Sequence, residues 1–190
     1  MSHPPQETHT YGMAPLIRFT LLGLYIALVL PLPLLAPEGW QVPLWAALAL
    51  GFAFVLAITS EKVILDEIGL RTTHPAWCRW LLRRGWELQW GQVEGLTPVA
   101  TSQGGRVFYV RTRSGAAPGA AREGNAYLLP QRVENFADFL ASFTERSGIP
   151  TASVARITPP WTYQLLAVVS AAMIVAEAIS LARLDLQPVG

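Results

Sequence analysis

Charged residues, cysteine and histidine are scarce in this sequence. Only 14% of the 190 residues are charged and 52% are hydrophobic, which is not the composition of a typical soluble domain. The single cysteine, Cys78, excludes an internal disulfide and fits a reducing compartment. Of the three histidines, two lie in the polar stretch before residue 15.

Motifs that carry catalysis are also missing. No glycine-rich phosphate loop precedes a predicted helix, and Gly104–Gly105 is typical of a hairpin turn. No nucleophile elbow occurs. His74 and Cys78 are four residues apart and could share a helix face, but two ligands do not make a zinc site. The sequence therefore predicts a protein that is not an enzyme and has no cofactor and no metal.

Hydrophobic residues are concentrated in three segments, 16–35, 42–60 and 161–181. Each is about 20 residues long, and at about 1.5 Å of rise per residue each can cross a hydrocarbon core of about 30 Å. The second segment carries no charge at all, and the third carries only Glu177. We predict three transmembrane helices.

Basic residues are distributed unevenly around these spans. Twelve of the 14 lysines and arginines lie between Lys62 and Arg156, whereas the loop 36–41 has none and the tail after residue 181 has only Arg183. Positively charged segments stay preferentially in the cytoplasm. We therefore expect the segment between the second and third spans to be cytoplasmic and the carboxy terminus to lie on the opposite side.

The spans divide the chain into six parts. We expect a polar tail at 1–14, a two-span hairpin at 15–60, a cytoplasmic domain at 61–150, a linker at 151–160, the third span at 161–182 and a second tail at 183–190.

Period-two alternation predicts several strands in the cytoplasmic domain. The run VILDEIGLRTT, residues 63–73, is partly alternating. Trp86, Leu88 and Trp90 alternate with polar residues in a half-buried strand that we expect to continue through Val93 and Leu96. Residues 108–112 form another strand, residues 114–125 a flexible connection, and AYLLP at 126–130 a short closing strand.

The period then changes to that of a helix. Residues at helical spacing predict a helix over 133–147 that Gly148 and Pro150 end. Its inward residues are expected to be Val133, Phe136, Ala137, Leu140 and Phe143. Antiparallel strands followed by one amphipathic helix make an α+β unit in which the helix closes a curled sheet.

Two short patterns carry a resemblance to a known family. "VILDEIGL" opens the domain, and W-x-x-V-x-G-L follows at 90–96, before two more strands and the terminal helix. This order, over roughly residues 61–148, resembles the bacterial pleckstrin-homology-like domains found beside transmembrane helices. The resemblance implies an integral membrane α-helical protein with an α+β, PH-like cytoplasmic domain, whose curled antiparallel sheet is closed by one C-terminal helix. No binding residue of that family transfers to this sequence.

The layout of the whole chain carries a second resemblance. "GWELQWGQVEGL", "AYLLPQRVENFA" and the order of the three spans are similar to small cyanobacterial membrane proteins associated with photosystem biogenesis. This implies a multi-pass protein of a cyanobacterial thylakoid or bacterial inner membrane, with photosystem subunits as partners.

The run HPAWCRWLLRRGWELQW, residues 74–90, holds four tryptophans and three arginines. Pro75 and Gly85 frame a predicted helix of about three turns. Indole rings and guanidinium groups suit a lipid headgroup layer or a protein partner. The candidate membrane- or partner-binding residues are Trp77, Arg79, Trp80, Arg83 and Arg84.

Packing inside the domain is the alternative for these aromatic residues. We expect it for Trp86 and Trp90, because alternating aromatic residues on a strand usually point inward. For Trp77 and Trp80, which arginines flank, an interface is favoured over the core. Nucleic acid is disfavoured, since twelve basic and nine acidic residues between 61 and 160 leave a surplus of only three positive charges.

Two features lie within the spans. Glu177, near the far end of the third span, must reach the interface or find a hydrogen-bond donor. Small residues line one face of the second span and permit close helix approach: Ala46, Ala49, Ala53 and Ala57, with Gly51 nearby. We expect this face to pack against the first span rather than against a partner helix, because the loop between the two spans has only six residues.

These observations favour a non-catalytic, membrane-anchored assembly, stabilisation or scaffold factor for a membrane protein complex, and the second resemblance implies a photosystem. One alternative is a module that binds anionic lipid headgroups. Another is an accessory subunit of a membrane enzyme or transporter.

Overall fold

The computed structural model describes residues 8–82, 85–100, 106–113, 126–154 and 160–185. The chain forms two compact units. Residues 1–14 and 60–158 form one, called here the sheet unit, and residues 15–59 and 159–190 form the other, called the helical unit. The turn expected at 104–105 and the connection expected at 114–125 lie outside the described residues.

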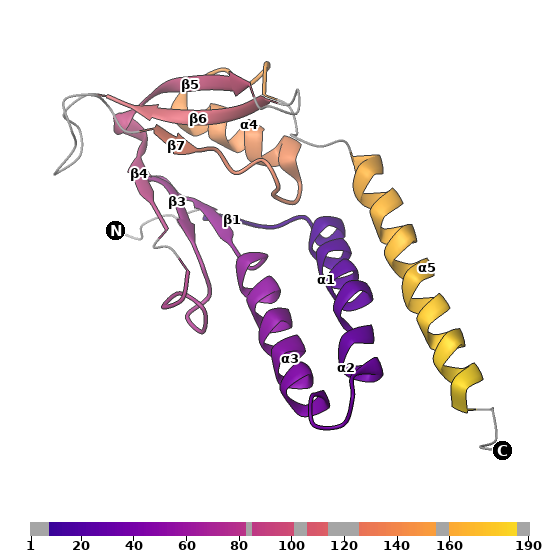
Figure 1. The fold of residues 1–190 in the computed structure, drawn as a ribbon. Coiled ribbons are helices and arrows are strands. Elements are labelled where there is room, and N and C mark those ends of the chain that lie inside the picture. The colour runs from indigo at the N-terminus through magenta and orange to yellow at the C-terminus, as the bar shows by residue number, and fades with distance from the viewer. Residues whose placement is uncertain (1–7, 83–84, 101–105, 114–125, 155–159, 186–190) are drawn as a thin grey trace. The chain divides into compact units, whose positions relative to one another are not determined.

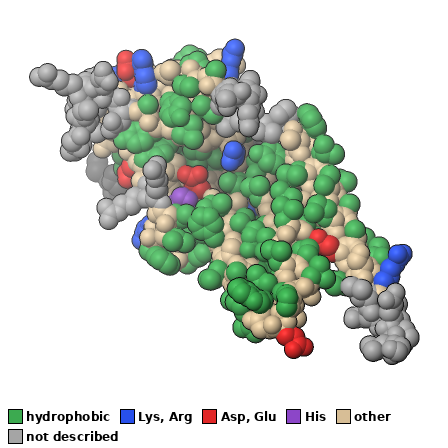
Figure 2. Space-filling view, viewed as in Figure 1, with side chains coloured by type: hydrophobic (Ala, Val, Ile, Leu, Met, Phe, Trp, Pro, Cys, Tyr) green, Lys and Arg blue, Asp and Glu red, His purple; other side chains and the backbone are tan. Residues whose placement is uncertain are grey.

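The helical unit consists of α1 (Pro15–Val29), α2 (Pro31–Leu35), α3 (Gln41–Ile58) and α5 (Pro160–Asp185). Three stretches are long and apolar enough to cross a membrane: Pro15–Leu35, Gln41–Ile58 and Trp161–Arg183. Figure 2 shows hydrophobic side chains spread over these helices. The predicted apolar helices are therefore confirmed, with bounds within a few residues of those expected. Pro31 separates α1 from α2 because a proline has no amide N–H to continue the helical ladder.

Helix α1 lies between α3 and α5 (Figure 1). The Tyr25 hydroxyl donates to the carbonyl oxygen of Leu48 (2.9 Å), and a Cβ on Gly51 would collide with that hydroxyl. The Thr20 hydroxyl donates to the Tyr163 carbonyl (3.3 Å), which joins α1 to α5. Gly51, rather than the alanine stripe, thus gives α1 its close approach to α3.

The alanine stripe of α3 departs from the expectation. Ala57 is buried, but Ala46, Ala49 and Ala53 are exposed. The prediction that the whole alanine face packs against the first span is wrong, because α3 contacts α1 through its neighbouring face around Gly51.

A four-stranded antiparallel sheet forms half of the sheet unit, in the order β1 (His9–Gly12), β2 (Lys62–Leu65), β3 (Gly69–Thr73) and β4 (Glu87–Gln89). Residues 9–12 belong to the segment expected to be a polar tail, and they instead add a strand in which Tyr11 pairs with Val63. A strand far away in sequence therefore completes this sheet.

Tyr11 fastens β1 to the rest of the sheet unit. Its buried hydroxyl donates to the Asp138 carboxylate (2.7 Å) and shares a hydrogen bond with the Ser142 hydroxyl (3.1 Å). Its ring meets the Phe139 ring edge-on at 5.5 Å. Burial is the main cause that raises the pKa of Tyr11 above 10.0.

The run 63–73 forms a hairpin rather than one strand. Asp66 turns the chain: its carboxylate accepts from the amides of Ile68 (3.0 Å) and Gly69 (2.9 Å). A short acidic side chain that accepts amide bonds two and three residues later is typical of an Asx-type turn. The pattern DEIG therefore ends β2 and starts β3.

The second sheet has three antiparallel strands, β5 (Val93–Ala100), β6 (Arg106–Thr112) and β7 (Ala126–Leu128). A 3₁₀ turn at Trp90–Gln92 separates β4 from β5, so the strand expected to run from Trp86 through Leu96 is broken. The described strands thus form two sheets, and the predicted single curled sheet closed by one helix is not observed among them.

Helix α4 (Phe136–Ser147) follows β7 and starts three residues later than expected, after Asn135 in the left-handed region (φ 45°). Gly148 ends it as predicted, also left-handed (φ 71°), with its amide donating to the Thr144 carbonyl (2.8 Å). Ala137, expected to point inward, is exposed, whereas Phe139 is fully buried.

The core of the sheet unit joins both sheets and α4. Trp86 and Trp90 are partly buried and pack against it, as expected. Trp90 also donates its indole N–H to the Asp66 carbonyl (2.8 Å) and meets Phe143 edge-on at 5.7 Å. The buried core residues are Tyr11, Val63, Leu65, Leu70, Leu88, Val93, Phe108, Val110, Leu129, Val133, Phe136, Phe139, Phe143 and Val154.

Candidate functional site

The segment between β3 and β4, residues 75–84, is called here the Trp–Arg loop. Its described part forms a series of turns instead of the predicted three-turn helix. The amides of Arg79 and Leu82 donate to the carbonyls of Pro75 and Cys78 (3.1 Å each), but no continuous helix results. The segment is framed at both ends by strands of one sheet, which holds its ends together.

Two tryptophans of this loop face solvent. Trp77 is 51% exposed and Trp80 81% exposed, and Arg79 and Leu81 are exposed with them. The Trp80 indole N–H donates to the Trp77 backbone carbonyl (2.9 Å), which holds the Trp80 ring against the turn. The structure thus brings Trp77, Arg79 and Trp80 together on one exposed turn. The other two predicted residues, Arg83 and Arg84, lie outside the described residues.

Cys78 anchors the loop. Its side chain is buried, with 1% exposed, and its thiol donates to the Pro75 carbonyl (3.5 Å). A small buried side chain between two exposed indoles holds the turn in place while the indoles point outward. The buried Cys78 side chain therefore holds the turn on which Trp77 and Trp80 are exposed.

The base of the loop is closed by two hydrogen bonds between Thr72 and Trp86, which follows the loop. The Trp86 amide donates to the Thr72 hydroxyl (3.2 Å), and the Thr72 amide donates to the Trp86 carbonyl (2.9 Å). A Cβ on Gly85 would collide with the Thr72 carbonyl oxygen. Gly85, expected to end a helix, instead permits two strands to approach at the base of the loop.

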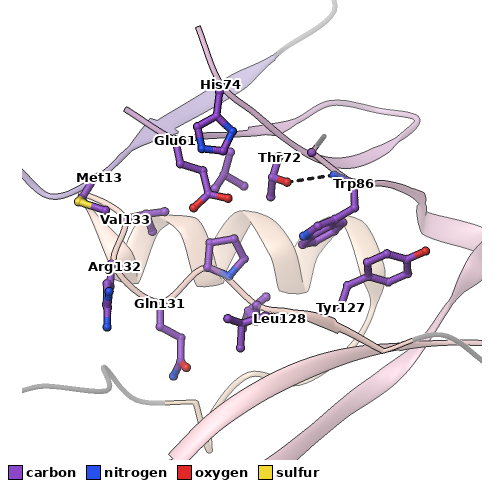
Figure 3. A pocket seen from close by; sticks show the side chains of 14 residues that line it. Met13, Glu61, Thr72, His74, Trp86, Tyr127, Leu128, Gln131, Arg132 and Val133 are labelled. Carbon is purple, nitrogen blue, oxygen red and sulfur yellow. Dashed lines mark hydrogen bonds between the residues drawn. The ribbon is translucent and has the colours of Figure 1, made fainter. Parts of the chain in front are cut away.

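A half-open cavity of about 450 Å³ lies in the sheet unit (Figure 3). The carboxylate of Glu61 points into it, and His74, at the same end of the β2–β3 hairpin, also lines it. The His74 Nδ1 atom is buried and has no hydrogen-bond partner among the described residues. The lining residues are Met13, Glu61, Val63, Thr72, His74, Gly85, Trp86, Tyr127, Leu128, Leu129, Pro130, Gln131, Arg132 and Val133.

The opposite wall of the cavity is aromatic. The rings of Trp86 and Tyr127 lie 5.1 Å apart, tilted by 36°. The cavity therefore has a polar side, at Glu61 and His74, and an apolar side.

His74 and Gly85, the two residues that flank the Trp–Arg loop, both line the cavity. The two ends of the Trp–Arg loop thus form part of the cavity wall. Within the described residues, no group of three histidine, cysteine or acidic side chains is placed to hold a metal ion, and His74 and Cys78 form no such group.

Glu177 lies in the helical unit, beside a cavity of about 300 Å³ lined by α2 and α5. One of its carboxylate oxygens, Oε2, is buried and has no partner in the described part of the chain. Ser180, one turn further on, is the other polar residue of this cavity. The remaining lining residues are Pro31, Leu34, Leu35, Ala176 and Leu181.

Comparison with known proteins identifies one relative of similar length. The chain is 35% identical over 161 residues to the uncharacterized protein slr0269 of Synechocystis sp., and the match covers 82% of this chain and 77% of that protein. The chain belongs to the family of this cyanobacterial protein. No protein-family model and no solved structure matches the chain.

The cavity was not predicted from the sequence. Glu61 and His74 are thirteen positions apart on either side of a hairpin, and Tyr127 is contributed by a distant strand of the other sheet. Recognising the hairpin at Asp66 would have placed Glu61 opposite the end of β3, but no pattern in the sequence indicates the gap between the sheets.

Proposed function

We propose that this protein is a non-catalytic, membrane-anchored assembly, stabilisation or scaffold factor, and that the Trp–Arg loop contacts a partner within a membrane protein complex. Trp77 and Trp80, both exposed on a turn anchored by buried Cys78, support this most directly. Protein interfaces are enriched in tryptophan and arginine, and a few such residues usually supply most of the binding energy.

The apolar helices supply the anchor in this proposal. The sheet unit is a PH-like adaptor facing the cytoplasm, with the carboxy terminus on the opposite side of the membrane. Antiparallel strands followed by a terminal helix support the PH-like assignment, although the strands lie in two sheets. The arginine distribution supports the orientation. Membership of a cyanobacterial protein's family and the layout of the chain favour a photosystem as the partner complex.

Binding to anionic lipid headgroups is the second candidate. The same loop favours it, because exposed indoles beside an arginine suit the boundary between lipid tails and headgroups. Each basic residue near an anionic leaflet contributes about 1 kcal/mol, so Arg79, Arg83 and Arg84 would bias orientation more than provide an anchor. The two candidates differ in how binding responds to salt and to partner protein.

A pull-down of the tagged full chain in gentle detergent, followed by identification of co-purifying proteins, tests the proposal. Trp77→Ala with Trp80→Ala should release the partner, because truncating a hot-spot tryptophan costs about 2 kcal/mol or more, about thirtyfold in Kd. Ile68→Ala is the matched control, since Ile68 is also an exposed hydrophobic residue of the sheet unit. A partner retained equally by the double variant and the control would refute the proposal.

The lipid candidate is tested with vesicles containing anionic lipid. Replacing Arg79, Arg83 and Arg84 with Gln is expected to leave the fold intact; Arg79 is exposed, and an exposed charge contributes little stability. Loss of vesicle binding in this triple variant, with the wild-type binding falling as salt rises, favours lipid. Vesicle binding that survives both sets of substitutions while the complex is lost favours a protein partner, and this is the result we expect.

A further inference from the structure

The polar side of the cavity in the sheet unit has unused bonding capacity. The Glu61 carboxylate points into the cavity and makes no ion pair with any described residue. His74 lines the same cavity and has a buried Nδ1 atom with no hydrogen-bond partner among the described residues. Buried polar atoms in folded proteins almost always have a partner, so the His74 Nδ1 atom calls for a partner from outside the described residues.

The charge of the cavity indicates the kind of group. Glu61 is the charged side chain that points inward, whereas the Arg132 side chain points away from Glu61 (Figure 3). An anionic ligand would therefore face a carboxylate at close range, while a cation would be attracted to it. An ammonium group carries three N–H donors, which matches the carboxylate oxygens and one imidazole nitrogen.

The remaining walls indicate what the ammonium group is attached to. Trp86 and Tyr127 form an aromatic wall, and Val63, Leu129 and Val133 add apolar surface. The volume of about 450 Å³ lies in the range of small-molecule pockets, about 300–1,000 Å³. The cavity can hold a small apolar or aromatic body.

We infer that this cavity binds a primary ammonium group carried on an apolar body, with Glu61 and His74 holding the ammonium and Trp86 and Tyr127 contacting the body. The ammonium could belong to a free organic amine or to a lysine side chain. The inference goes beyond the proposed function and holds whether or not the Trp–Arg loop has a partner.

Calorimetric titration of the full chain in detergent tests this inference with three ring compounds of similar size. Benzylamine should bind with a Kd of about 1 mM or tighter, benzyl alcohol more weakly and benzoate not measurably. Benzoate binding as tightly as benzylamine, or no benzylamine binding at millimolar concentration, would overturn the inference.

Variants of the polar side make the test specific. Glu61→Gln should weaken benzylamine binding about tenfold or more, because a charge-assisted hydrogen bond is lost, and should leave benzyl alcohol binding unchanged. His74→Ala should weaken benzylamine binding several-fold. Glu67→Gln is the matched control, since Glu67 is an exposed carboxylate in the β2–β3 turn, and it should have no effect. Unchanged benzylamine binding in Glu61→Gln, with an unchanged thermal transition, would contradict the assignment.

A fourth compound distinguishes the source of the amine. Nα-acetyl-lysine methylamide presents the ammonium on a flexible chain, whereas benzylamine presents it on a ring. Tighter binding of the lysine compound indicates a lysine side chain of another protein, and tighter binding of benzylamine indicates a free aromatic amine. Both results require Glu61 and support the inference.

Discussion

Phe139 should be among the most sensitive positions in the sheet unit. It has no exposed surface, and its ring meets Tyr11 edge-on with the ring centroids 5.5 Å apart. Its ring also stacks on Phe136 at 6.2 Å and lies tilted against Phe143 at 6.4 Å. Phe→Ala changes at buried sites cost about 3–5 kcal/mol, part of which comes from the cavity left behind. We expect Phe139→Ala to lie in the upper half of this range, because an aromatic edge contact adds about 0.5–1.5 kcal/mol beyond burial.

Small domains have about 5–15 kcal/mol of total stability, so this variant should unfold part of the population. Amide hydrogen exchange of β1–β4 in the full-length protein in detergent reports the loss as faster global opening. Leu140→Ala, at a partly buried position of the same helix, should cost less, and Ala137→Ser, at an exposed position, about 0.5 kcal/mol or less. Exchange in Phe139→Ala no faster than in Leu140→Ala would refute the packing of α4.

Three other predictions follow from the structure and the proposal. Gly85→Ala should lower the melting temperature of the sheet unit, because the new Cβ collides with the Thr72 carbonyl, and near-ultraviolet circular dichroism would detect this. Tyr11→Phe should cost about 1–2 kcal/mol near neutral pH. Burial raises the pKa of Tyr11, so the neutral phenol stabilises the fold fully below the unfolded pKa of 10.0, and this stabilisation is lost as pH rises through the folded pKa. Denaturant titrations should therefore show that the free energy of unfolding falls less at alkaline pH in Tyr11→Phe than in the wild type. A carboxy-terminal reporter should be accessible from the non-cytoplasmic side, and protection there would reverse the topology.

The long apolar segments were predictable because a span is a property of local composition. Twenty consecutive apolar residues specify a membrane helix whatever the rest of the chain does. The packing face of α3 was not predictable in this way: small residues occur on two sides, and the side used is decided by Tyr25 of another helix.

Strand boundaries in the sheet unit depended on single side chains. The alternating pattern of 63–73 continues through Asp66, yet its carboxylate caps a turn there. A similar pattern continues from Leu88 to Val93, where a 3₁₀ turn sends the chain into the second sheet. Alternation reports which residues can be half-buried, and it does not report where pairing with a neighbour ends.

The candidate site was predictable only in part. The mixture of tryptophan and arginine at 77–84 indicated an exposed surface, and Trp77 and Trp80 are exposed. In the described part, residues 75–82, turns replace the expected helix because the segment connects two adjacent strands of one sheet and Cys78 is buried. Strand β1 and the cavity depend on contacts between residues far apart in the chain, which no local pattern encodes.

Photo-crosslinking at position 80 tests the central claim most directly. A photoreactive amino acid replaces Trp80 in the full chain within native membranes, and the same group at Val99, an exposed residue of β5, serves as the control. We predict a discrete protein adduct from position 80 that is absent from position 99 and is lost when Trp77→Ala is added. Adducts with lipid alone, or the same adducts from both positions, would contradict the claim that the Trp–Arg loop contacts a protein partner.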